Sequence, residues 1–103
     1  MRIIIFITAG KKKEAQGIAK ALVKNKLAAC VNIIPRVESF FWWKGEVDRA
    51  QEFLLVVKSK KARLPGIIKL VKSLHSYDIP ETIAFRIVDG EKSYLRWLDA
   101  AIR

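Results

Sequence analysis

The stretch of sequence that decides the fold is residues 39–58, SFFWWKGEVDRAQEFLLVVK. It opens with four consecutive aromatic residues after Ser39, passes through Lys44-Gly45, and returns as a second run of strand-forming residues that ends at Lys58. Gly45 adopts a positive φ angle without steric cost, so we expect the chain to reverse there. The stretch therefore predicts one long β-hairpin.

The returning strand of this hairpin is apolar on both of its faces. Side chains alternate along a strand, so Phe53, Leu55 and Val57 point to one side of the sheet while Leu54 and Val56 point to the other. A chain of 103 residues has too few other elements to cover both sides. We therefore expect an oligomer, in which a second copy covers the remaining face.

The segments around the hairpin alternate between strand and helix patterns. Residues 2–8, 27–42 and 81–88 are of strand length and rich in β-branched or aromatic residues. Pro35 interrupts the second of these strands, which predicts an edge position or a bulge, because proline donates no ladder hydrogen bond.

Apolar residues recur at helical spacing within residues 12–26 and 60–74. Asp89 is expected to cap a final helix that carries Tyr94 and Leu98. The complete order predicts an α+β, ferredoxin-like βαββαβ fold in a single domain of residues 1–103, with a C-terminal helix. In this topology the first and third strands are central and the two helices cover one face.

Composition limits the classes of function. The chain has no apolar run long enough to span a membrane, and its single cysteine excludes an internal disulfide and fits a cytoplasmic protein. Its net charge of +10 suggests an anionic partner, but the lysines are spread over the expected helix faces, so nucleic-acid binding through the basic surface is the weakest of the functional hypotheses. Abundant Lys and Ile with only two Asn and two Gln are typical of a thermostable protein.

The side chains that carry chemistry are few. The only histidine, His75, and the only thiol, Cys30, lie in different parts of the pattern, so we expect no nucleophile and base pair, no enzyme activity, and a buried Cys30. His75, Tyr77, Asp78 and Glu81 offer ligand types suited to a divalent ion. In the alternative interpretation, His75 ends the preceding helix and Tyr77 fills a gap.

Several sequence stretches, taken together, resemble the CutA family of divalent-cation tolerance proteins over essentially the full length. The matching stretches, in chain order, are LAACVNI at residues 27–33, Ser39 with WWKG at residues 42–45, Glu52 and Lys58, the pattern His75-x-Tyr77-x-x-Pro80-Glu81, and Tyr94-Leu95-x-Trp97-Leu98.

This resemblance implies a cytosolic homotrimer of ferredoxin-like subunits, linked to copper tolerance in bacteria and related by fold to PII-type signalling trimers. It implies no established enzyme activity. The copper ligands proposed for some members are a cysteine in the first strand and two adjacent histidines, and the corresponding positions here are Ile7, Leu74 and His75. With one ligand of three present, the resemblance implies weak binding of copper at His75.

Two functional hypotheses follow for such a trimer. In the first, a divalent cation or another small ligand binds in clefts between subunits, with Trp43, Glu52, Lys58 and Tyr77 as candidate cleft residues beside His75. In the second, the protein is a PII-like signalling or structural trimer that acts through protein partners without metal. Both hypotheses share the same expected trimer interface, which comprises Phe41, Trp42, Trp43, Leu54 and Val56.

Overall fold

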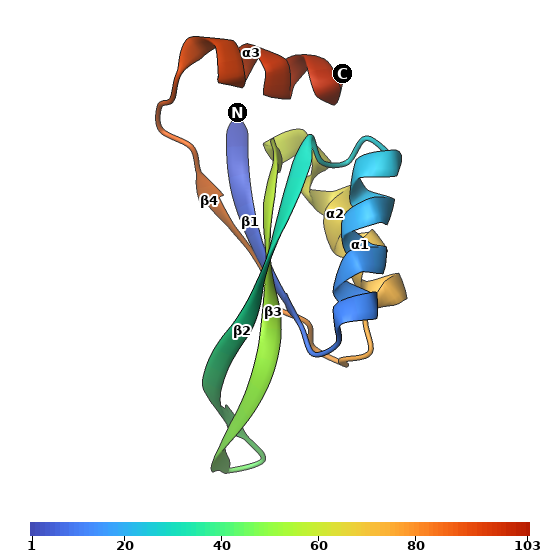
Figure 1. The fold of residues 1–103 in the computed structure, drawn as a ribbon, viewed down its shortest axis with the longest axis vertical. Coiled ribbons are helices and arrows are strands. Elements are labelled where there is room, and N and C mark those ends of the chain that lie inside the picture. Colours follow the sequence, from blue (N-terminus) through green and yellow to red (C-terminus); the bar gives the residue numbers. More distant parts are fainter.

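The computed structural model describes residues 1–103 as a four-stranded antiparallel sheet with helices packed against it (Figure 1). The elements, in order, are β1 (Arg2–Ala9), α1 (Lys12–Lys24), β2 (Cys30–Trp43), β3 (Glu46–Lys60), a short 3₁₀ helix (Lys61–Arg63), α2 (Leu64–Leu74), β4 (Thr82–Arg86) and α3 (Lys92–Ala101). The strand order β2-β3-β1-β4 confirms the ferredoxin-like prediction, with the first and third strands in the centre. No helix combines the length and apolar character that crossing a membrane requires.

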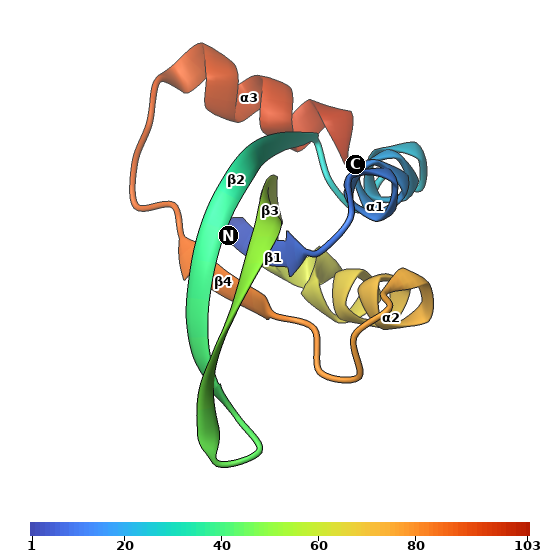
Figure 2. The ribbon, with the colours of Figure 1, turned by 60° about the horizontal axis from the view of Figure 1, so that its bottom comes forward.

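Helices α1 and α2 lie on one face of the sheet and form the core with it (Figure 2). Leu55 and Val57 point towards these helices, as the alternation along β3 predicted, and both are fully buried. The other main contributors are Ile3, Ile5 and Ile7 of β1, Ala15, Ile18 and Leu22 of α1, and Ile67 and Val71 of α2.

The opposite face of the sheet is also apolar, but much of it is open. Phe6 on β1 is the cross-strand partner of Val56 on β3 and of Ile83 on β4, so these three side chains share this face. Ile83 and Phe85 remain 48% and 42% exposed. A single chain therefore presents a contiguous apolar sheet surface to water, as the sequence predicted.

Helix α3 crosses the end of the sheet where β1 begins and β3 ends (Figure 1). Asp99 holds it there through an ion pair with Arg2 at 2.8 Å and a longer one with Lys60 at 3.8 Å. The prediction that Asp89 caps this helix is wrong. The cap is Glu91, whose carboxylate accepts hydrogen bonds from two backbone N–H groups of the first turn, whereas Asp89 accepts from the adjacent Gly90.

Two predicted strands are shorter than the sequence pattern suggested. The second begins at Cys30 rather than at Leu27, because the backbone N–H groups of Leu27 and Ala28 both bond to Leu22 O and complete the end of α1. The fourth ends at Arg86 rather than at residue 88. Its neighbour Ile87 makes one more hydrogen bond to β1, and the chain then turns away from the sheet.

The hairpin of β2 and β3 extends well beyond β1. The last residue of β1, Ala9, pairs with Phe53, so residues 46–52 of β3 pair only with β2. Lys44 and Gly45 form the turn with φ angles of 51° and 81°, which fits a two-residue turn with positive φ at both positions. A register shift between Ile34 and Val37 confirms the bulge predicted at Pro35.

Candidate functional site

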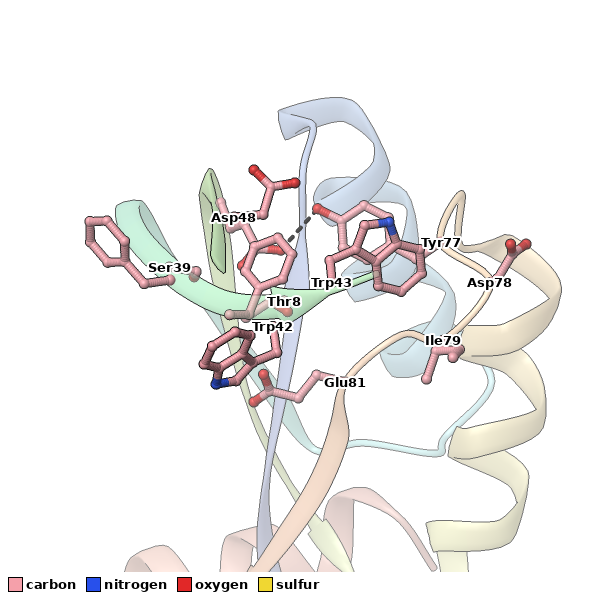
Figure 3. Close-up of a pocket in the computed structure, with 12 residues that line it drawn as sticks. Thr8, Ser39, Trp42, Trp43, Asp48, Tyr77, Asp78, Ile79 and Glu81 are labelled. Atoms are coloured by element: carbon pink, nitrogen blue, oxygen red, sulfur yellow. Dashed lines mark hydrogen bonds between the residues drawn. The ribbon is translucent and has the colours of Figure 1, made fainter. Parts of the chain in front are cut away.

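A cavity of about 830 Å³ opens at the base of the hairpin, where the hairpin leaves the sheet (Figure 3). Its walls come from three parts of the chain: the outer hairpin, the end of β1 at Thr8, and the loop that follows α2. The hairpin contributes the aromatic residues 40–43 together with Glu52, and the loop contributes Tyr77 and Glu81. The structure thus brings together three of the predicted cleft residues, Trp43, Glu52 and Tyr77.

Glu52 and Tyr77 form the best-defined polar contact of the cavity. The Tyr77 hydroxyl donates a hydrogen bond of 2.9 Å to Oε2 of Glu52, a residue that is only 7% exposed (Figure 3). Partial burial of the phenol, followed by the bond to Glu52 and the charges of Glu52 and Glu14, raises the pKa of Tyr77 to about 12. Tyr77 is therefore a hydrogen-bond donor throughout the physiological pH range.

Gly10 provides the space that the Tyr77 hydroxyl occupies. A Cβ atom at Gly10 would lie 2.9 Å from Tyr77 Oη, so Gly10→Ala should push the hydroxyl away from Glu52. We expect the pKa of Tyr77 to fall towards the ordinary value of 10. Ultraviolet titration of the phenol measures this pKa. The experiment uses a protein that also carries Tyr94→Phe, so that Tyr77 is the only tyrosine.

The matched control for this substitution is Gly17→Ala on α1. A Cβ atom there meets nothing within 4 Å, so the substitution should stabilise the helix by about 0.5–1 kcal/mol and leave the Tyr77 titration unchanged. A Gly10→Ala protein with an unaltered Tyr77 titration would contradict the proposed link between Gly10 and the Tyr77–Glu52 contact.

The cavity is acidic although the chain as a whole is strongly basic. Four carboxylates line it, those of Asp48, Glu52, Asp78 and Glu81, and no lysine or arginine does. Burial and the neighbouring charge of Glu52 raise the pKa of Glu81. The two glutamates therefore lie close enough to repel each other, and a cation placed between them would relieve that repulsion.

His75 does not line this cavity, and its ring is fully engaged by the backbone. Nε2 lies 2.7 Å from the Thr8 carbonyl oxygen, and Nδ1 lies 3.1 Å from the Tyr77 backbone nitrogen. A carbonyl only accepts and an N–H only donates, so the ring is the neutral tautomer with its proton on Nε2. His75 ends α2 and fixes the start of the loop, as the structural interpretation of this residue predicted.

Lys58 lies elsewhere in the chain, near the opposite end of β3. Its ammonium group contacts Asn32 Oδ1 and lies 3.9 Å from the Cys30 sulfur. The fold of one chain therefore does not bring Lys58 together with Glu52 and Tyr77. The expectation that Cys30 is buried was also wrong, since it is half-buried where β2 begins on the helix-free face.

Sequence reasoning missed Asp48, although the signal was available. Once the turn is placed at Lys44 and Gly45, antiparallel pairing sets Asp48 opposite Phe41. Extending the predicted hairpin register by a few residues would therefore have put this carboxylate beside the aromatic residues.

Nearly the whole chain matches one known family. The family described as CutA1 divalent ion tolerance protein matches residues 3–101. This chain belongs to the CutA family. The fold and the sequence resemblance thus lead to the same conclusion.

Relatives in this family occur in bacteria, archaea and plants. CutA of Thermus thermophilus, described as a divalent-cation tolerance protein, is 45% identical over 95% of each chain, and its solved structure gives a TM-score of 0.93. The structure of Archaeoglobus fulgidus CutA, described as periplasmic, is 43% identical over 100% of each chain with a TM-score of 0.96. The chain is 40% identical to the chloroplastic CutA 1 of rice and spans 57% of that protein's length.

The residues of this CutA chain do not fit a resident copper centre. No three His, Cys, Asp or Glu side chains are grouped so that they would hold a metal ion. At the positions of the proposed copper ligands, Ile7 is fully buried in the core and Leu74 is apolar. The third, His75, has both ring nitrogens in hydrogen bonds to the backbone.

Proposed function

We propose that the protein is a non-enzymatic, cytoplasmic homotrimer that serves divalent-cation tolerance by binding a ligand in clefts between subunits. Each cleft would include the cavity at the base of the hairpin. The observation that carries this proposal is the apolar sheet face opposite α1 and α2, which a single subunit leaves open around Phe6, Ile83 and Phe85.

The exposed hairpin is a second observation that supports assembly. Trp42 is 76% exposed and Phe40 is 63% exposed in the isolated subunit, although large aromatic side chains are the residues that most often anchor interfaces. Burial of these rings and of the open sheet face gains about 25 cal/mol per Å² of apolar surface. We therefore propose that Phe41, Trp42, Trp43, Leu54 and Val56 form the interface.

A ring of three subunits would cover the edges of each sheet as well as its open face. Strands β2 and β4 are both edges, and an open edge invites uncontrolled pairing with other chains. A closed ring lets an edge of one subunit meet a neighbour, and it leaves no free edge for further growth. The sequence resemblance to the CutA family also favours three subunits.

Copper binding, as we propose it, is weak. An ion at His75 would have to replace the hydrogen bond to Thr8 or the one from Tyr77, and no other metal-binding side chain is grouped there. Calorimetric titration of copper into the wild-type protein and into His75→Ala tests this proposal. We expect weak, saturable binding that His75→Ala reduces.

Two outcomes would contradict this metal proposal. Identical curves for the two proteins would remove His75 as a ligand, and tight binding by the wild type would require a metal centre that these residues do not form. His75→Ala is compared only after its melting curve shows a folded protein, since the ring also fixes the loop after α2.

A further inference from the structure

The cavity at the base of the hairpin joins an acidic lining with an aromatic wall. It carries four carboxylates and no basic residue in a protein of net charge +10, and one of its walls consists of the aromatic residues 40–43. An anionic ligand would meet only repulsion there. A neutral ligand would leave the acidic groups without a partner.

Glu52 has an oxygen available for a ligand. Its Oε2 accepts the hydrogen bond from Tyr77, whereas Oε1 accepts none from the protein. No fully buried side-chain oxygen of this protein lacks a hydrogen-bond partner, so Oε1 keeps some accessible surface, and Glu52 lines the cavity. The residue is more than nine-tenths buried, so this oxygen is largely shielded from bulk water. A charge-assisted hydrogen bond from a cationic donor strongly stabilises a buried carboxylate that has one oxygen without a partner.

The aromatic wall selects among cations. A hydrated divalent metal ion requires several converging oxygen ligands, and no such group of three exists here. Indole and phenyl faces instead attract weakly hydrated organic cations, and they cover apolar carbon atoms attached to the charge. The cavity volume of about 830 Å³ lies within the range of sites for small organic molecules.

We propose that this cavity binds a protonated alkylamine, with the ammonium group between Glu52 and Glu81 and the hydrocarbon part against Trp42 and Trp43. This inference rests on the proposed function, because it assigns a ligand class to the cleft of the assembled protein. Burial and the charge of Glu52 both raise the pKa of Glu81, and an ammonium group between the two carboxylates would offset the repulsion between them.

The test is calorimetric titration of the assembled protein with hexylammonium. Hexanoate and hexanol have the same chain length with the opposite charge or none, and tetramethylammonium has the charge without an N–H donor. We expect saturable binding of hexylammonium, weaker binding of tetramethylammonium, and no binding of hexanoate or hexanol. Equal binding of hexanol or hexanoate would overturn the proposal.

Substitution of single carboxylates locates the site. Glu52→Gln keeps the shape and an acceptor for Tyr77 but removes the charge, so it should weaken hexylammonium binding roughly 10- to 100-fold. Glu81→Gln is the second variant in case Glu52→Gln fails to fold. The matched control is Glu38→Gln, an exposed carboxylate of the same hairpin that does not line the cavity. Unchanged affinity in both cavity variants would overturn the assignment.

Light scattering on the same samples separates this inference from the proposed function. A trimeric protein that binds no hexylammonium would overturn the alkylamine site and leave the trimer intact, as when a neighbouring subunit fills the cavity. A monomeric protein that binds hexylammonium through Glu52 would overturn the trimer and support the ligand class.

Discussion

Val56→Asp should abolish assembly and destabilise the subunit fold at the same time. Val56 lies on the helix-free face in the part of β3 that pairs with both β1 and β2, and its cross-strand partners are Phe6 and Asn32. In the proposed trimer a neighbouring subunit covers this position, so the new carboxylate would be buried without a partner. The usual cost of such a charge is about 3–5 kcal/mol, and it is paid in each of three subunits.

Light scattering and thermal melting measure the two effects together. The wild-type mass should be about three times the subunit mass of 11.8 kDa, and Val56→Asp should shift it towards 11.8 kDa with a lower melting temperature. Leu54→Asp, on the same face, should behave alike. Lys20→Glu on the exposed side of α1 reverses a charge without touching either the core or the interface, and should change neither quantity.

A wild-type mass near 11.8 kDa at micromolar concentration would contradict the trimer outright. A Val56→Asp protein that keeps the wild-type mass would instead show that the subunits meet elsewhere, and it would remove the helix-free face from the proposed interface.

The fold was predictable because its signals are local. Gly45 marks the turn, the alternation along residues 53–57 gives both faces of β3, and the helical spacing of residues 12–26 places α1. Each of these patterns depends on neighbours a few residues away. The strand order then follows from the small number of ways in which βαββαβ units pack.

The site was only partly predictable because it depends on contacts between distant segments. Glu52 and Tyr77 meet across 25 residues of sequence, and no local pattern indicates which carboxylates converge. Glu52 and Lys58 share a strand face by alternation, but six residues of strand separate them by about 20 Å. The tautomer of His75 depends on Thr8, which is 67 residues away and unrelated to any motif.

Trp42→Ala should dissociate the trimer and leave the subunit folded. Trp42 lies on the part of the hairpin beyond β1, and at 76% exposure it contributes little to the core of its own subunit. Loss of a tryptophan anchor from an interface commonly costs about 2–4 kcal/mol, so three copies would lower the dissociation free energy of the trimer by about 6–12 kcal/mol. Sedimentation over a range of concentrations measures this shift, and circular dichroism shows whether the subunit stays folded.

The control for Trp42→Ala is Val23→Ala, which truncates a 44% exposed apolar residue on α1, away from the hairpin and the open sheet face. It should leave the dissociation curve unchanged. If Trp42→Ala instead unfolds the protein while Val23→Ala does not, the hairpin supports the fold of its own subunit rather than the interface. If neither variant changes the dissociation curve, Trp42 faces solvent in the trimer, and the contact between subunits rests on the sheet face alone.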